Sequence, residues 1–329
     1  MVVVSVPGKI HLMGEHAVVY GKPALLAAIN LRLRVTVEEG KRGADIISGE
    51  PSDYIRHAIE IIRQEYKLAG LPPMKITVQS DIPAGYHLGS SAAVAVGTVG
   101  AVTYFLKKIW NPEAINQIAY EVEKKMHGNP SGGDNTIVTM GGLIWYRREL
   151  EFLKSIWQLP FKIPENLNHF FLINTGKPKE TTGEMVRFVN VKCQMSNVKY
   201  KTLFDRNEEQ AKRVAVAIKE GNEKELMDAM KVGERTLEGM GVVSRKVIPL
   251  IRKIEKAGGA AKILGGGGRT DGVGFLLCYH HAPKKAEHLS QKVGWPMLPI
   301  RLGEEGIRLE NNKSTNDKST NIQMNESIV

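Results

Sequence analysis

The chain has 329 residues, of which 42% are hydrophobic and 24% are charged, and its formal net charge is +10. This length and composition are typical of a globular protein with one bilobal domain or two medium domains, whose core needs no disulfide staples. No run of about 18 uncharged apolar residues is present, so we expect no membrane span and no membrane partner. The two cysteines and the lack of a basic leader predict a reduced, cytoplasmic protein.

The excess of positive charge is compatible with three kinds of partner: a nucleic acid, an anionic membrane or an anionic small substrate. Lys and Arg form no dense basic block, and only 6% of the residues are aromatic. Nucleic-acid binding needs a clustered basic face with stacking platforms, so we expect no nucleic-acid partner. Solvated helix faces, together with a site for nucleotide phosphates, account for the excess.

The first half of the chain alternates β-rich runs with helical patterns. Residues 31–38 alternate apolar and basic side chains, as a half-exposed strand does, whereas residues 1–6 have the composition of a buried strand. Ile55, Ile59 and Ile62 recur on one face of a helix that Gly70 ends. The predicted strands are residues 1–6, 31–38 and 74–80, and the predicted helices are residues 53–69, 90–108 and 112–126.

A change of pattern near residue 165 predicts a boundary between two lobes, because Pro160 and Pro164 precede a polar segment there. After it we expect several helices between residues 205 and 257. The predicted strands are residues 169–174, a run that ends near Gly265, residues 273–279, and a small terminal sheet from residues 298–302 and 307–309. The predicted domains are residues 1–165, residues 166–310 and a polar tail, residues 311–329, which has too few apolar residues to bury and is expected to be disordered.

The first cluster of candidate functional residues follows the opening strand. Pro7, Gly8 and Lys9 lead into a glycine-punctuated loop that carries Glu15 and His16. An ammonium group delivered by a strand would stabilise an anion or lower the pKa of a nearby hydroxyl group. The alternative is a surface lysine followed by an ordinary turn.

A glycine-containing loop, residues 83–89, runs directly into the helix of small residues that begins at Ser90. The N-terminus of a helix presents free N–H groups and a positive dipole end, which suit a phosphate. Ser90 and Ser91 add hydroxyl donors or a magnesium ligand. The alternative is a capped helix whose alanines only permit close packing.

Two carboxylates form the third cluster. Glu123 lies near the end of a helix, and Asp134 follows a tight turn that contains Asn129, Pro130 and three glycines. One carboxylate would hold Mg²⁺, which prefers hard oxygen ligands, and the other would lie beside an acceptor hydroxyl group. The alternative is that Asn129 and Asp134 serve turn formation alone.

Four consecutive glycines, Gly265 to Gly268, form the last unusual segment. Such a run is costly to order, and it is tolerated where the backbone approaches a ligand closely or in a linker. Strand patterns on both sides argue against a linker. Neither the G-x-G-x-x-G fingerprint nor the P-loop motif G-x-x-x-x-G-K-[ST] occurs, and the histidines lack metal-ligand spacing.

Taken in order, these motifs resemble those of the GHMP kinases. The matching segments are P-G-K-x₅-E-H-A-V-V-Y-G from Pro7, G-x-x-L-G-S-S-A-A from Gly85, H-G-N-P-S-G-x-D-N from His127 and the late glycine run. The resemblance extends from about residue 4 to residue 310. At residues 14–21 and 127–135 the chain is similar to the mevalonate kinase subfamily.

The resemblance implies an α+β fold, in which an N-terminal lobe like ribosomal protein S5 domain 2 joins a ferredoxin-like C-terminal lobe. The active site would lie between the lobes and use ATP and Mg²⁺ to phosphorylate the primary alcohol of mevalonate. A homodimer is one assembly that the resemblance allows.

The resemblance also implies roles for individual residues. Asp134 matches the catalytic aspartate and Lys9 its partner lysine, whereas Glu123, Ser90 and Ser91 match magnesium ligands. The implied acceptor-binding residues are Glu15, His16 and Thr181. The implied nucleotide-binding residues are Pro83, Gly85, His87, Leu88, Gly89, Ser90, Ser91, Ala92, Gly265, Gly266, Gly267 and Gly268.

Two departures from the family pattern concern the nucleotide side. His87 stands where the family has glycine in the phosphate loop, and Arg269, Thr270 and Asp271 follow the glycine run in place of small residues. These departures bear on nucleotide affinity and choice more than on acceptor chemistry. The alternatives are a GHMP kinase with phosphomevalonate, homoserine or a sugar as acceptor, and a non-catalytic nucleotide-binding protein.

Overall fold

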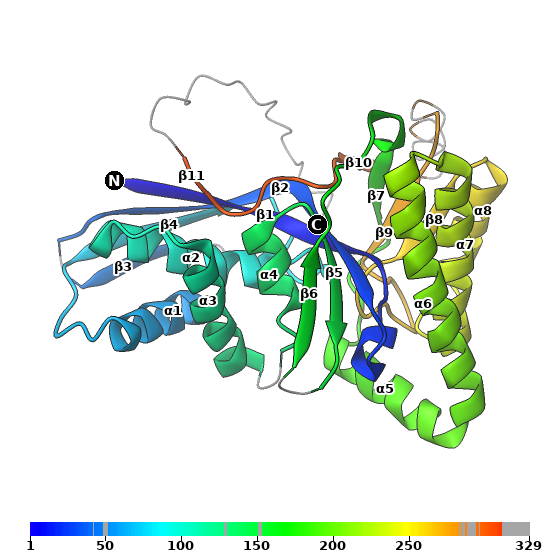
Figure 1. Ribbon diagram of the computed structural model, residues 1–329, viewed down its shortest axis with the longest axis horizontal. Helices are drawn as coiled ribbons and strands as arrows, with labels where there is room; N and C mark the ends of the chain where they lie inside the picture. The colour runs from blue at the N-terminus through cyan, green and yellow to red at the C-terminus, as the bar shows by residue number, and fades with distance from the viewer. Residues whose placement is uncertain are drawn as a thin grey trace.

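The computed structural model describes residues 1–41, 43–48, 52–127, 130–150, 153–282, 284, 287, 294–295 and 297–310. The predicted disordered tail, residues 311–329, lies outside the described residues, as do Gly128 and Asn129 of the third motif. Within the described residues, two β-sheets carry helices on their faces (Figure 1). This mixture of helices and largely antiparallel strands confirms the predicted α+β class.

Two long antiparallel strands, β1 (Val2–Met13) and β2 (Ala24–Glu39), form the centre of the first sheet. Both are longer than predicted, because residues 24–29 are uniformly apolar and buried and so lack the alternation that marked residues 31–38. The strand order is β11-β1-β2-β4-β3, and β5 and β6 branch from β2. The remaining strands of this sheet are β3 (Ala44–Ser48), β4 (Met74–Ser80), β5 (Leu143–Arg148), β6 (Lys154–Gln158) and β11 (Arg308–Leu309).

In the described part of the chain, four helices accompany the first sheet, and apolar side chains buried between helices and sheet form the core. The helices are α1 (Ser52–Glu65), α2 (Ser90–Lys107), α3 (Pro112–His127) and α4 (Gly133–Met140). Helix α2 packs directly on β1 and β2, and it also contacts α1 and α3 (Figure 1). A Cβ atom on Gly97 would lie 2.8 Å from Val35 Cγ2, so the small residues of α2 allow its backbone to approach the sheet closely.

Helix α1 is shorter than predicted, and helix α2 is apolar enough to need comment. Helix α1 ends at Glu65 and not at residue 69, because Lys67 adopts a left-handed conformation with a φ of 48°. Helix α2 alone, among the described residues, is long and apolar enough to cross a membrane by length and composition. Of its apolar window, 72% is buried inside the molecule, as is typical of a core helix.

The second sheet is antiparallel and has the order β10-β7-β9-β8. Its strands are β7 (Phe170–Asn174), β8 (Ala260–Ile263), β9 (Phe275–Tyr279) and β10 (Met297–Ile300), and its helices are α5 (Thr182–Met195), α6 (Asn197–Glu220), α7 (Glu223–Met240) and α8 (Ile248–Lys256). The helical region therefore begins at Thr182, and the prediction of helices only from residue 205 missed α5 and the start of α6. Helix α5 alternates polar and apolar residues weakly and exposes most of its surface, which explains the weak pattern.

The prediction of a small terminal sheet is wrong. β10 pairs with β7 in the second sheet, whereas β11 pairs with β1 in the first, where Leu309 lies opposite Val4. Each segment completes the edge of an existing sheet, and local sequence carries no signal of such distant pairing. The end of the described chain therefore returns to the N-terminal sheet, and the lobe boundary near residue 165 stays a prediction.

A buried arginine holds this returning segment in place. Arg32 on β2 is 6% exposed, and its guanidinium donates hydrogen bonds to the carbonyl oxygens of Ser5, Glu305 and Gly306 at 3.1, 2.9 and 2.8 Å. It also donates to the Ser5 hydroxyl at 3.0 Å. Planar, multiply donating guanidinium groups are suited to joining several carbonyl groups in this way.

We expect Arg32→Leu to lower the free energy of unfolding by about 2–4 kcal/mol, because it leaves buried carbonyl groups without donors. Urea unfolding measures the change. Arg34→Leu on the same strand is the matched control, because Arg34 is exposed and its ion pair with Asp81, 3.6 Å long, is exposed as well. This substitution should change the free energy of unfolding by less than about 1 kcal/mol. Equal effects of the two substitutions would contradict the role of Arg32.

Candidate active site

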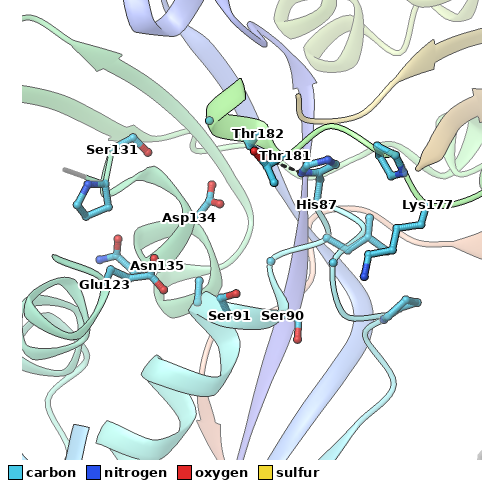
Figure 2. A pocket seen from close by; sticks show the side chains of 18 of the residues that line it. His87, Ser90, Ser91, Glu123, Ser131, Asp134, Asn135, Lys177, Thr181 and Thr182 are labelled. Carbon is cyan, nitrogen blue, oxygen red and sulfur yellow. Dashed lines mark hydrogen bonds between the residues drawn. The ribbon is translucent and has the colours of Figure 1, made fainter. Parts of the chain in front are cut away.

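A cavity of about 750 Å³ opens between the helices of the first sheet and the segment that joins β7 to α5 (Figure 2). Its walls come from the loop between β4 and α2 with the first turn of α2, Glu123 of α3, residues 130–135, and residues 177–183. Of the residues singled out in the sequence, the cavity brings together Pro83, Gly85, His87, Leu88, Gly89, Ser90, Ser91, Ala92, Glu123, Asp134 and Thr181. The others, Lys9, Glu15, His16 and Gly265 to Gly268, are not among its lining residues.

An ion pair stands at the edge of this cavity. Lys9 Nζ on β1 lies 3.0 Å from Asp134 Oδ2 in the first turn of α4. The lysine side chain is 4% exposed, whereas that of Asp134 is 42% exposed and reaches the cavity. Burial raises the pKa of Asp134, but the charge and the hydrogen bond of Lys9, together with His11 and His87, outweigh burial and hold that pKa below its ordinary value. Asp134 is therefore ionised at neutral pH and ready to accept a proton or a hydrogen bond.

The loop between β4 and α2, residues 81–89, fixes the position of Lys9. The Lys9 backbone N–H donates to the Leu88 carbonyl at 2.9 Å. A Cβ atom on Gly89 would lie 2.7 Å from Lys9 Cγ, and Gly89 has a φ of +84°, so only glycine lets the loop pass over the lysine stem. One loop thus positions both the Lys9 ammonium group and the N-terminus of α2.

The start of α2 has the features of a phosphate site. The loop before it contains positive φ values at Gly85, His87 and Gly89, and Ser90 opens the helix. The first N–H groups of a helix have no partner within the helix, and Ser90 and Ser91 of the first turn of α2 line the cavity. Lys177 also lines the cavity, and its Nζ lies 3.5 Å from the position of a Cβ atom on Gly85, so a second cation lies beside this loop.

The imidazole of His87 turns toward the second lobe. Its Nδ1 is hydrogen-bonded to Thr182 Oγ1 at 3.3 Å (Figure 2), and a Cβ atom on Gly265 would lie 2.5 Å from the His87 ring. Burial, and then the charge of Lys9, lower the pKa of His87 to about 4. The uncharged ring contacts the second lobe, and the departure from glycine at this position is accommodated by the glycine at 265.

The glycine run lies one layer behind the cavity wall. A Cβ atom on Gly266 would lie 3.2 Å from Thr182 Cα, and one on Gly267 would lie 2.2 Å from the Val242 carbonyl oxygen. A side chain at either position would push the wall segment or α7's following loop aside. Close packing accounts for this run, and its direct contact with phosphate stays a prediction.

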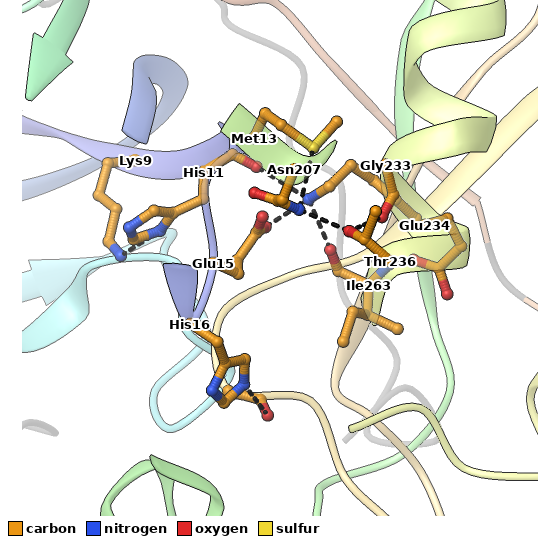
Figure 3. Close-up of polar contacts among 12 residues, drawn as sticks. Lys9, His11, Met13, Glu15, His16, Asn207, Gly233, Glu234, Thr236 and Ile263 are labelled. Atoms are coloured by element: carbon orange, nitrogen blue, oxygen red, sulfur yellow. Dashed lines mark hydrogen bonds and ion pairs between the residues drawn. The ribbon is translucent and has the colours of Figure 1, made fainter. Parts of the chain in front are cut away.

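Glu15 and His16, which follow β1, contact β8 of the second sheet and the glycine run after it (Figure 3). Glu15 is 2% exposed and forms an ion pair with Lys262 of β8, which also donates to the His11 carbonyl at 3.2 Å. Burial raises the pKa of Glu15 even though Lys262 opposes it. His16 Nε2 donates to the Gly266 carbonyl at 3.0 Å. Their predicted contact with the acceptor stays a prediction.

Glu123 is the second carboxylate of the site and is 6% exposed. Burial, and then the negative charge of Asp134, raise its pKa to about 7. Its carboxylate and the Ser90 and Ser91 hydroxyls line one cavity, and these hard oxygen donors fit Mg²⁺. Among the described residues no three His, Cys, Asp or Glu side chains gather to hold a metal ion, so phosphates and water would complete the coordination.

Sequence reasoning missed several residues of this region. His11 contacts Lys9, Lys262 pairs with Glu15, and Lys177 and Thr182 line the cavity. A signal was available only for the wall at α5, where Thr181 and Glu184 form a capping box of the T-x-x-E type. Thr181 therefore caps α5 at the cavity edge, whereas its role toward an acceptor stays a prediction.

The fold and this site define a GHMP-type small-molecule kinase. Residues 53–142 match the model of the GHMP kinases N terminal domain. The mevalonate kinase of Archaeoglobus fulgidus is 35% identical over 315 residues, covering 94% of this chain and 99% of that protein. The mevalonate kinase of Thermococcus gammatolerans is 31% identical over 345 residues, covering 94% and 98%.

The solved structures agree. The mevalonate kinase of Methanococcus jannaschii superposes with a TM-score of 0.77 at 22% identity, covering 92% of this chain and 98% of that one. The phosphomevalonate kinase of Streptococcus pneumoniae, in complex with phosphomevalonate and AMPPNP, gives 0.72 at 19% identity, covering 92% and 100%. The chain therefore belongs to the mevalonate kinase family of GHMP kinases, and the predicted GHMP kinase fold is confirmed.

We expect Asp134→Asn to lower the pKa of Glu123 from its value of about 7, because the like charge disappears while that of Lys9 remains. A pH titration of ¹³C-labelled glutamate side chains by NMR measures the change. Glu234 is the internal control, since burial raises its pKa to about 8 without a contribution from Asp134. An unchanged or higher pKa of Glu123 in the variant would contradict the coupling.

Proposed function

We propose that the protein transfers the γ-phosphoryl group of ATP to the primary alcohol of mevalonate and forms 5-phosphomevalonate. The observation that supports it most is the Lys9–Asp134 ion pair, 3.0 Å long, beside a helix N-terminus that suits phosphates. The choice of mevalonate as acceptor rests on the relatives, which are mevalonate kinases over nearly their full length.

The nucleotide would bind with its phosphates against the first turn of α2. Ser90, Ser91 and Glu123 are the residues that would hold Mg²⁺, which neutralises charge on the phosphate oxygens when it is bound. Glu123 is half ionised near neutral pH and becomes a better ligand as it loses its proton. Lys177 adds a cation on the opposite wall, where it would meet either the triphosphate or the carboxylate of the acceptor.

The reaction is an in-line displacement at phosphorus. The acceptor oxygen forms a bond to the γ-phosphorus as the bond from this phosphorus to the β–γ bridging oxygen breaks, and ADP leaves. The hydroxyl proton passes to the Asp134 carboxylate, and Lys9 stabilises the negative charge that develops on the attacking oxygen. Phosphoryl transfer proceeds through a loose transition state, so most of the acceleration comes from positioning and charge stabilisation.

The cellular setting is part of the same proposal. Cys193 and Cys278 are both free thiols in the structure, which supports a reducing, cytoplasmic location. The proposal also includes Glu15, His16 and Thr181, which would act on the acceptor side through the contacts and the cavity wall that they form.

A homodimer is the proposed assembly, and it rests on the family resemblance alone.

Incubation with ATP, Mg²⁺ and mevalonate tests the proposal, with the product identified by mass spectrometry. We expect mevalonate to gain one phosphoryl group, and we expect Asp134→Ala to reduce kcat by about 100-fold or more while the protein stays folded, because the proton acceptor is lost. Phosphomevalonate, homoserine and galactose serve as competing acceptors. Turnover of one of these without turnover of mevalonate would overturn the proposed acceptor.

A further inference from the structure

Lys9 has a second partner besides Asp134. His11 follows two residues later on β1, so both side chains project from the same face of the strand. His11 Nδ1 lies 3.4 Å from Lys9 Nζ (Figure 3), while Asp134 Oδ2 lies 3.0 Å from the same nitrogen. Two of the three ammonium hydrogens of Lys9 are thus directed at the imidazole and the carboxylate.

The chemistry of the contact defines the state of the imidazole. An ammonium group only donates hydrogen bonds, so Nδ1 must be the acceptor and the ring hydrogen must reside on Nε2. Burial, Lys9, Lys262 and His87 lower the pKa of His11, and Asp134 raises it, with a net result of about 3. His11 is therefore neutral at physiological pH.

The backbone of His11 is held as firmly as its ring. On one side it pairs with Leu26 of β2, and on the other its carbonyl accepts from Lys262 Nζ at 3.2 Å. Lys262 also pairs with Glu15, so the strand segment that carries His11 is fixed by both lobes. The Cα–Cβ bond of His11 therefore stays on the strand face that carries Lys9.

We propose that His11 is a positioning residue of the phosphoryl-transfer site, whose neutral imidazole accepts one hydrogen of Lys9 and orients the ammonium group. With Asp134 and His11 as acceptors, one hydrogen of Lys9 is left for a further acceptor, which under the proposed function is the attacking oxygen. Without His11 the ammonium group would rotate about Cε and share its hydrogens differently. The identity of the attacking oxygen rests on the proposed function. The contact between His11 and Lys9 rests on the structure without substrate.

Two substitutions separate positioning from packing. His11→Leu keeps a side chain of similar reach but removes the Nδ1 hydrogen-bond acceptor. His11→Asn keeps a hydrogen-bond acceptor, Oδ1, near the position of Nδ1. We expect His11→Leu to lower kcat by about 10- to 100-fold with KM values for ATP and mevalonate within about threefold, and His11→Asn to recover most of the loss. His57→Leu, at a half-buried histidine on α1 outside the site, is the control and should leave kcat unchanged.

Two kinetic outcomes would overturn the inference. One is a His11→Leu enzyme with the kcat of the unmodified protein. The other is an equal loss in His11→Leu and His11→Asn accompanied by a lower unfolding midpoint, which would make the role structural. In the unmodified protein, failure to phosphorylate mevalonate would overturn the proposed function without deciding the role of His11.

A measurement without substrate decides that role independently. Nitrogen NMR of ¹⁵N-histidine-labelled protein should show His11 as the Nε2–H tautomer, with no titration between about pH 5 and 8. Lys9→Met should shift the Nδ1 resonance, because the donor to that nitrogen disappears. An Nδ1–H tautomer, a cationic ring or an Nδ1 signal that ignores Lys9→Met would overturn the inference.

Discussion

The ion pair between Lys9 and Asp134 is the contact on which the rest of the site depends. Transfer of an ammonium group from water into a site where it is 4% exposed costs on the order of several kcal/mol unless a partner compensates. Asp134 supplies that compensation from α4, and the loop at Leu88 and Gly89 encloses the lysine stem. Strand β1, helix α4 and the loop before α2 therefore all meet at Lys9, through an ion pair, a backbone hydrogen bond and close packing.

Polar contacts between the lobes give the cavity its second wall. Glu15 pairs with Lys262, His16 donates to Gly266, and His87 is hydrogen-bonded to Thr182. Each contact joins a motif residue of the N-terminal half to the second sheet or to α5. Glu15, His16 and His87 thus make these contacts in the structure, and their predicted contact with a ligand stays a prediction.

How much was predictable follows from how local each signal is. The start of α2 at Ser90 and the strand 74–80 were correct, because capping, periodicity and turn residues act over a few positions. The order of the family motifs along the chain predicted that Lys9 and Asp134 belong to one site. No local pattern around either residue indicates this. The pairing of β11 with β1, the orientation of His87 and the contact of His11 with Lys9 depend on segments distant in sequence, and nothing near those residues reports them.

The central claim is that Lys9 and Asp134 act as one unit on the attacking oxygen, and a double-mutant cycle on kcat tests it most directly. Lys9→Met, Asp134→Asn and the double variant are compared with the unmodified protein in single-turnover assays. If the two groups act together, the double variant loses about as much activity as the more impaired single variant. Losses that multiply in the double variant would show that the groups act independently and would contradict the account.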